Sequence, residues 1–100
     1  MDKVGILARV VAKVGKEEAV ATFLKSALPL AEGEKATTVW YAIRMGQREF
    51  GIFDAFPDQN GRQAHLSGPI AKALMEKAPE LLDGPPQIEN VDVLAAKLPK

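Results

Sequence analysis

β-Branched, aromatic and other apolar residues are concentrated in four stretches of the chain, residues 4–13, 37–44, 49–56 and 88–96. Such stretches are typical of β-strands, in which successive side chains point to opposite faces of a sheet. In the first stretch both alternating sets are largely apolar. One set is Val4, Ile6, Ala8 and Val10, and the other is Leu7, Arg9 and Val11. The sequence therefore predicts four strands, the first with apolar side chains on both faces.

Helical spacing of apolar residues separates these strands. Between residues 17 and 31 the apolar positions recur every three or four residues, and Pro29 predicts a kink or an end there. After the third strand, Asp58 is a candidate N-cap for a short helix through His65. Pro69 suits the first turn of another helix. We expect that helix to carry Ile70, Leu74, Met75 and Ala78 and to break at Pro79.

The order is strand–helix–strand, twice, and predicts one α+β domain over residues 1–100 with the ferredoxin-like βαββαβ fold. Residues 45–48 are short enough to join strands two and three as an antiparallel hairpin. Helices would cover one face of this sheet. The other face would carry Leu7 and Val11, together with either Trp40 and Ala42 or the alternating set of residues on the same strand. Because that face is too apolar for water, we expect a homodimer whose sheets pack into a barrel-like unit.

Composition narrows the classes of function. Lys and Arg together number 13, as do Asp and Glu, so the basic excess of a nucleic-acid-binding protein is absent. No long apolar run or polybasic cluster indicates a membrane. The lack of cysteine excludes disulfides, thiolate metal sites and a cysteine nucleophile. The first residues lack the apolar core of a signal peptide, so we expect a cytoplasmic protein.

Residues 50–56 (FGIFDAF), followed by Asp58, Ala64, His65 and Leu66, resemble the antibiotic biosynthesis monooxygenase superfamily. The resemblance implies a dimeric α+β barrel. It also implies an acidic residue on strand three, here Asp54, an aromatic residue two places on, Phe56, and a helix that ends in Ala64-His65. Two departures stand out: residues 60–62 (NGR) replace apolar helix positions, and Pro69 lies where many relatives carry a second histidine.

The resemblance implies oxygenation of a small phenolic or hydroquinone compound without metal, flavin or haem, so no cofactor is expected. His65 is the only histidine and the candidate general base, with Asp54 to orient its ring. Alternatively, His65 has a structural role and its hydrogen bonds fix a helix end. Haem degradation, known in another branch, is not expected, because Trp40 lies on strand two rather than near the helix.

Aromatic and arginine side chains are the candidates for binding an aromatic substrate. They are Trp40, Tyr41, Phe53, Phe56, Arg9 and Arg44. Adjacent residues on a strand face opposite sides, so only one of Trp40 and Tyr41 would line a pocket. Core or interface packing is the alternative for each aromatic residue, and a dimer salt bridge is the alternative for Arg9. Two functions therefore remain open: a cofactor-independent monooxygenase, and a non-catalytic ligand-binding or interaction module on the same scaffold.

Overall fold

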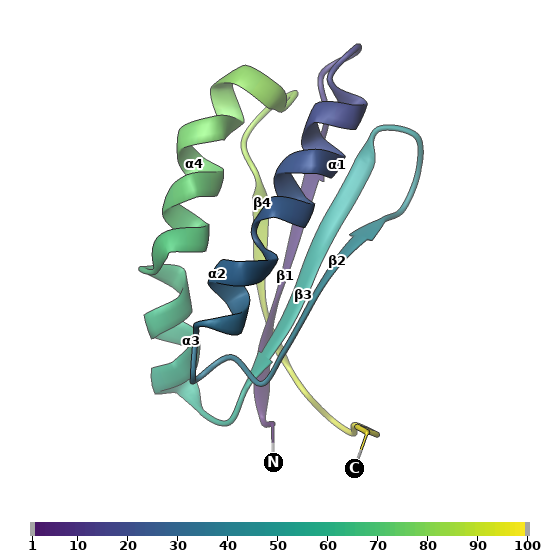
Figure 1. Ribbon diagram of the computed structural model, residues 1–100. Coiled ribbons are helices and arrows are strands. Elements are labelled where there is room, and N and C mark those ends of the chain that lie inside the picture. The colour runs from purple at the N-terminus through teal and green to yellow at the C-terminus, as the bar shows by residue number, and fades with distance from the viewer. Residues whose placement is uncertain (1, 100) are drawn as a thin grey trace.

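A computed structural model describes residues 2–99 as one antiparallel sheet with all its helices on one face (Figure 1). The strands are β1 (Val4–Val11), β2 (Val39–Arg44), β3 (Glu49–Phe56) and β4 (Gln87–Asp92), in the order β2-β3-β1-β4. The first and third strands are therefore the central pair, flanked by the second and fourth. This order and the antiparallel pairing confirm the ferredoxin-like α+β fold predicted from the sequence.

The helices are α1 (Glu17–Ser26), α2 (Leu28–Glu32), α3 (Gln59–Leu66) and α4 (Pro69–Leu81). Pro29 lies in the first turn of α2, where its missing N–H would have had no partner in any case, so the expected kink is a break between two helices. The carboxylate of Asp58 accepts a hydrogen bond from the Gly61 N–H at 3.0 Å, which confirms the N-cap of α3. No helix within residues 2–99 is long and apolar enough to span a membrane.

Two features of α4 differ from the prediction. The helix continues through Pro79 to Leu81, because proline removes one N–H donor while the Leu82 N–H still bonds to the Ala78 carbonyl at 2.9 Å. The ammonium group of Lys13 adds a hydrogen bond to the Pro79 carbonyl at 2.7 Å. Met75 lies outside the buried stripe and is 59% exposed.

Two strands are shorter than predicted. The second begins at Val39 rather than at residue 37, and β4 ends at Asp92 rather than near residue 96. The reason for the second difference lies in the pairing: Asp92 is opposite Val4, the first residue of β1. A last backbone hydrogen bond joins the Val93 N–H to the Lys3 carbonyl at 2.9 Å. β1 itself begins at Val4, so the ladder between the two strands ends at this point.

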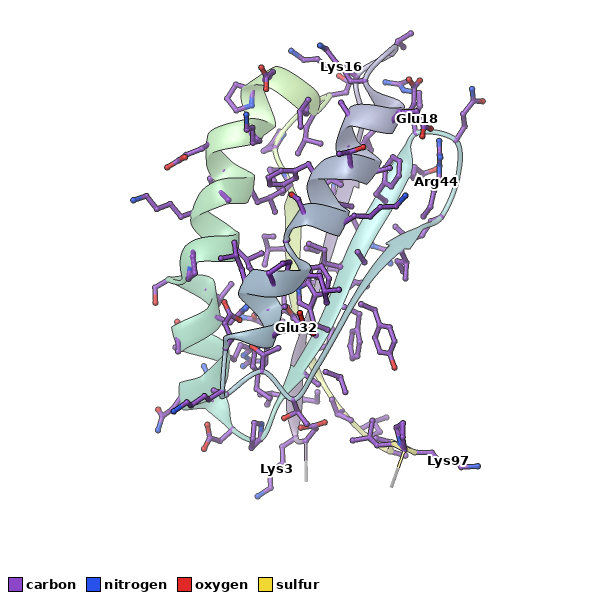
Figure 2. The ribbon with its side chains drawn as sticks, in the orientation of Figure 1. Lys3, Lys16, Glu18, Glu32, Arg44 and Lys97 are labelled. Atoms are coloured by element: carbon purple, nitrogen blue, oxygen red, sulfur yellow. The ribbon has the colours of Figure 1, made fainter. Side chains whose placement is uncertain are left out.

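The register divides the side chains of the sheet between two faces. Ile6, Asp54 and Trp40 lie opposite one another on β1, β3 and β2, on the face that the helices cover. We call this the covered face; it also carries Ala8, Val10, Ala42, Arg44, Phe50, Ile52 and Phe56. The open face carries Leu7, Arg9, Val11, Tyr41, Ile43, Phe53, Glu89 and Val91, and Figure 2 shows side chains projecting from the sheet on this side. Trp40 and Ala42 therefore lie on the covered face, and their neighbours on β2, Tyr41 and Ile43, lie on the open face.

The core lies between the covered face and the helices. Its main cluster joins the sheet to the buried sides of α1 and α4, and a smaller cluster lies below α2. Trp40 contacts both clusters and is partly exposed. Phe56 and Asp54 are both completely buried, although one is apolar and the other is an acid. A buried carboxylate needs compensation, and this requirement leads to the candidate site.

Candidate functional site

Three titratable side chains from separate elements meet under the helices. His65 near the end of α3 lies between Asp54 of β3 and Glu34, which is in the loop before β2. Its Nε2 is 2.8 Å from Oδ2 of Asp54, and its Nδ1 is 2.7 Å from Oε1 of Glu34. The His65 side chain is only 8% exposed, and that of Glu34 is 16% exposed. We call Glu34, Asp54 and His65 the acid–histidine cluster.

Local structure brings these groups together. The cap at Asp58 fixes the start of α3, and the helix then carries His65 back over the end of β3, where its ring lies 5.3 Å from the ring of Phe56. Gly61 lets the loop before β2 approach α3 closely. A Cβ at this position would lie 3.2 Å from the Cβ of Ala36 and 3.3 Å from that of Phe56. The missing side chain thus allows Glu34 to reach the histidine ring.

The two contacts of His65 are not equivalent. The hydrogen bond with Glu34 is well aligned, whereas the carboxylate of Asp54 is close to Nε2 but lies off the direction of an aligned hydrogen bond. Neither oxygen of Asp54 has an aligned donor among residues 2–99. The Asp54 carboxylate therefore depends on the charge of the imidazolium rather than on a set of donors.

Opposing effects act on the proton affinity of His65. Burial is the largest and lowers its pKa, because desolvation disfavours the imidazolium. The interactions with Asp54 and then with Glu34 favour the imidazolium, and together they outweigh burial. The pKa of His65 is consequently raised above its ordinary value of 6.5.

Glu34 uses only one of its two oxygens. Oε1 accepts a hydrogen bond from the Thr37 hydroxyl at 2.8 Å in addition to its contact with His65. Oε2 is buried and has no hydrogen-bond partner in the part of the chain that the structure describes. The indole N–H of Trp40 is also buried and, over the same residues, unpaired. Such groups are costly unless a ligand or water satisfies them.

Two cavities adjoin these unpaired groups. One, of about 160 Å³, lies between the loop before β2 and the junction of α3 and α4; it is lined by Glu34, Lys35, Ala36, Thr37, Gly61, Ala64, His65, Gly68 and Pro69. The other, of about 420 Å³, is lined partly by Glu34, Thr37 and Trp40. A Cβ on Gly68 would lie 3.3 Å from Oε2 of Glu34, so this oxygen borders the smaller cavity. We call that smaller space the His65 cavity.

The other candidate residues are divided between three places. Phe56 packs beside His65, and Trp40 lines the larger cavity. Arg44 lies at the far end of the covered face, where its guanidinium is 3.3 Å from Glu18 and stacks over Phe50; Figure 2 shows Glu18 and Arg44 pointing toward each other. It lines a separate cavity of about 220 Å³ between α1 and β2.

Arg9, Tyr41 and Phe53 lie on the open face, and the structure does not bring them together with His65. Arg9 forms an exposed ion pair with Glu89 at 3.2 Å, within the same chain. Tyr41 is 56% exposed. These three side chains belong to a surface that the helices leave uncovered.

Glu34 is the residue of this site that sequence reasoning missed. It lies 31 residues from His65, in a stretch that the sequence marks only as a loop. Glu32 is two positions away and has the same side chain, so neither spacing nor residue type distinguishes the two. Only the fold brings Glu34 to the histidine.

The cluster is not arranged as a metal site. Its two carboxylates contact opposite nitrogens of one imidazole ring, so the three side chains do not converge on a single point. Among residues 2–99 no group of three His, Asp or Glu side chains has the geometry to hold an ion. The arrangement can instead hold and share protons between a ring and two carboxylates.

Comparison with solved structures identifies the class of fold. The chain matches a protein described as a "putative antibiotic biosynthesis monooxygenase" from Nitrosomonas europaea with a TM-score of 0.80 at 12% identity, over 92% of this chain and 90% of that one. A protein with the same description from Bacteroides thetaiotaomicron matches with a TM-score of 0.72 at 19% identity, over 99% and 96%. The protein therefore has the fold of the antibiotic biosynthesis monooxygenase superfamily, as the sequence motif indicated.

A nearer relative defines the family. NE2512 from Nitrosomonas europaea, described as a protein of unknown function, is 56% identical, with a TM-score of 0.97 over 100% of this chain and 97% of that one. The chain belongs to the same family as NE2512. No family model and no curated protein matches the sequence.

Proposed function

We propose that the protein is a cofactor-independent monooxygenase that oxidises a small phenol or hydroquinone with O2. The observation that carries the proposal is a buried histidine held between two carboxylates beside a small cavity. The fold is shared with proteins described as "putative antibiotic biosynthesis monooxygenase". A further structural relative from Bacteroides thetaiotaomicron is described as a possible oxidoreductase.

The proposed reaction needs no reductant other than the substrate. A hydroquinone loses a phenolic proton, and the electron-rich anion reduces O2. One oxygen atom enters the ring and the other leaves as water, so that one hydroquinone and one O2 give one hydroxyquinone and one water. The ring supplies all four electrons. The protein must remove the proton, stabilise the anion and exclude water.

The chain has groups suited to each task. His65 and Asp54 are the proposed catalytic pair, in which the carboxylate orients the ring and favours its charged form. The charged ring would stabilise negative charge in the cavity. The unpaired indole N–H of Trp40 is a further donor for the oxygen of an anion in the adjoining cavity. Phe56 supplies an apolar wall behind the ring.

We propose that the working unit is a homodimer joined through the open face. This face exposes apolar side chains in the single chain: Tyr41 is 56% exposed, Ile43 40% and Val11 37%. Leu7, Phe53 and Val91 extend the same surface across the sheet. A second copy of the sheet would bury it, as the dimeric barrel of the superfamily implies.

Oxygen uptake with a panel of hydroquinones and naphthols tests the proposed activity. Activity should survive dialysis against a chelator and in colourless protein, and ¹⁸O2 should place one labelled atom in the product. The His65→Gln variant should lose about 10²–10³-fold in turnover, the range for removing one group that stabilises developing negative charge. Gln63→Ala, an exposed position on the same helix, is the matched control. Activity that requires added flavin, haem or metal would contradict the proposal.

One observation favours the second candidate function, a non-catalytic ligand-binding module. Both ring nitrogens of His65 are already engaged by carboxylates, which also suits a purely structural role. In that case His65→Gln would lower stability, while ligand affinity would change only as far as folding does. Measured binding of phenols without any oxygen uptake would favour this function over the first.

A further inference from the structure

We propose that Glu34 is the residue that recognises the substrate: its free Oε2 accepts a hydrogen bond from a ring hydroxyl of a neutral phenol in the His65 cavity and takes the proton when the ring reacts. The chemical half of this inference rests on the proposed oxygenase function. The binding half does not, because it concerns only which ligands the cavity holds. Neither the sequence motif nor the relatives' descriptions assign a role to this residue.

The hydrogen bonds of Glu34 leave one acceptor vacant. Oε1 is engaged by both the Thr37 hydroxyl and Nδ1 of His65, which fix the position of the carboxylate. Oε2 is buried without a partner within residues 2–99. A buried carboxylate oxygen fixed in this way lacks only a donor, and a ligand hydroxyl is a donor. By contrast, neither nitrogen of His65 is available, since each faces a carboxylate.

The size and lining of the cavity suit one aromatic ring. Its volume of about 160 Å³ is large enough for one aromatic ring, and it opens to solvent on the side of the exposed residues Lys35, Ala36, Ala64 and Pro69. Small residues make this space, since Ala36, Gly61, Ala64 and Gly68 line it. Gly68, a residue of the lining, leaves room beside the buried Oε2, because a Cβ there would come within 3.3 Å of that oxygen.

Charge determines which ligands the site accepts. The acid–histidine cluster contains two carboxylates and one imidazole, and Lys35 is the other charged group in the lining, at an exposed position. A neutral hydroxyl can donate to Oε2, whereas an anionic ligand such as benzoate would meet an acceptor that already carries negative charge. A methyl ether of the same size cannot donate at all. The site should therefore select phenol over both anisole and benzoate.

The proton transfer balances within the cluster. The O–H bond of the phenol breaks, its electron pair stays on the phenolate oxygen, and the proton forms a new bond to Oε2 of Glu34. Glu34 becomes neutral while His65 remains an imidazolium next to Asp54. The negative charge thus moves from the carboxylate to the ring, where O2 is reduced, and the positive charge of His65 stays close to both.

Calorimetric titration of the full chain with phenol, anisole and benzoate tests the binding half. The wild-type protein should bind phenol at least about tenfold more tightly than either analogue. In Glu34→Gln, an amide group with one oxygen acceptor and one N–H donor takes the place of the carboxylate. The preference for phenol over anisole should therefore fall to within about threefold. Glu76→Gln, an exposed carboxylate on α4, is the matched control and should keep the wild-type preference. Equal binding of phenol and anisole by the wild type, or an unchanged preference in Glu34→Gln, would overturn the inference.

Two further variants decide the matter if Glu34→Gln does not fold. Glu34→Asp keeps the charge but withdraws the carboxylate, and Ala64→Leu fills the cavity from an exposed helix position. Each should weaken phenol binding at least about tenfold, and wild-type affinity in either would contradict the inference. Oxygen uptake is measured on the same samples. If phenol binds selectively and this binding depends on Glu34, but no oxygen is consumed, the oxygenase function is rejected and the binding site is kept. If oxygen uptake is unchanged in Glu34→Gln, the role of Glu34 is rejected and the oxygenase function is kept.

Discussion

The two faces of the sheet carry different chemistry although the same strands supply both. On the covered face, side chains such as Phe56 and Val10 are enclosed by the chain's own helices, and this face also holds a fully buried carboxylate, Asp54. On the open face, the neighbouring residues Tyr41 and Ile43 remain exposed. The first face is enclosed by the chain's own helices along β1 and β3, although Ala42 and Arg44 on β2 remain exposed. The second is apolar and has no such cover.

The two faces show two ways in which the protein accommodates side chains that are unfavourable where they lie: a buried carboxylate and exposed apolar groups. Asp54 is costly to bury, and the protein places His65 against it rather than exposing it. The apolar side chains of the open face are costly to expose, and no element of the described chain covers them. A site can therefore be built within the chain on one face, while the other is suited to association.

The largest expected effect comes from Phe56→Ala. This side chain is completely buried beside His65, so its removal should lower the free energy of unfolding by about 3–5 kcal/mol through lost burial and an internal cavity. Chemical denaturation at several protein concentrations measures it. Phe53→Ala, three positions away on the open face, is the comparison, and its loss should depend on protein concentration if a dimer buries it. Equal, concentration-independent losses would remove the distinction between the faces.

A charge on the open face should disrupt association. Tyr41→Asp is expected to weaken the homodimer by about 2 kcal/mol or more, roughly thirtyfold, because a buried aromatic anchor is replaced by a carboxylate. Sedimentation velocity over a dilution series measures this. Thr22→Asp, on the exposed side of α1 and away from the open face, is the control. A wild-type protein that stays monomeric at micromolar concentration would contradict the dimer itself.

His65→Gln should have an effect that depends on pH. Because the pKa of His65 is raised in the folded protein, the stabilisation is fully present below the unfolded value of 6.5 and is lost as the pH rises through the folded pKa. The variant should therefore cost about 1–3 kcal/mol at pH 6 and less at alkaline pH. Denaturant melts of both proteins across this range measure the difference. If the difference in free energy of unfolding between the two proteins increased with pH, the neutral ring would be the stabilising form.

The smallest effect is expected at the far end of the covered face. Glu18→Gln removes the ion pair with Arg44, whose two side chains are 84% and 43% exposed. Such a pair contributes about 0–1 kcal/mol and is weakened by salt. Thermal melts at low and high ionic strength measure it. A loss above about 2 kcal/mol would mean that this region is buried in the assembled protein.

Much of the architecture could be predicted because it depends on short-range patterns. The third strand spans Glu49–Phe56 as predicted, between the short connection of residues 45–48 and Pro57, and the cap of α3 follows from Asp58 alone. The boundaries that were predicted wrongly depend on partners. β4 ends at Asp92, opposite the first residue of β1, and Lys13 and the end of β1 form hydrogen bonds with the last turn of α4, beyond Pro79.

For the candidate site, the sequence indicated Asp54 and His65 through a motif within one stretch of the chain, and the fold places them 2.8 Å apart. The sequence also predicted that Trp40 and Tyr41 face opposite sides of the sheet, because the direction of the side chains alternates along every strand. Which of them faces the helices is decided by the register that sets Trp40 opposite Asp54. Glu34 joins His65 only because the loop packs against Gly61, a contact between residues far apart in the chain. Periodicity and caps are local and can be read in order, whereas a charge is compensated by whatever group the folded chain brings within about 3 Å of it.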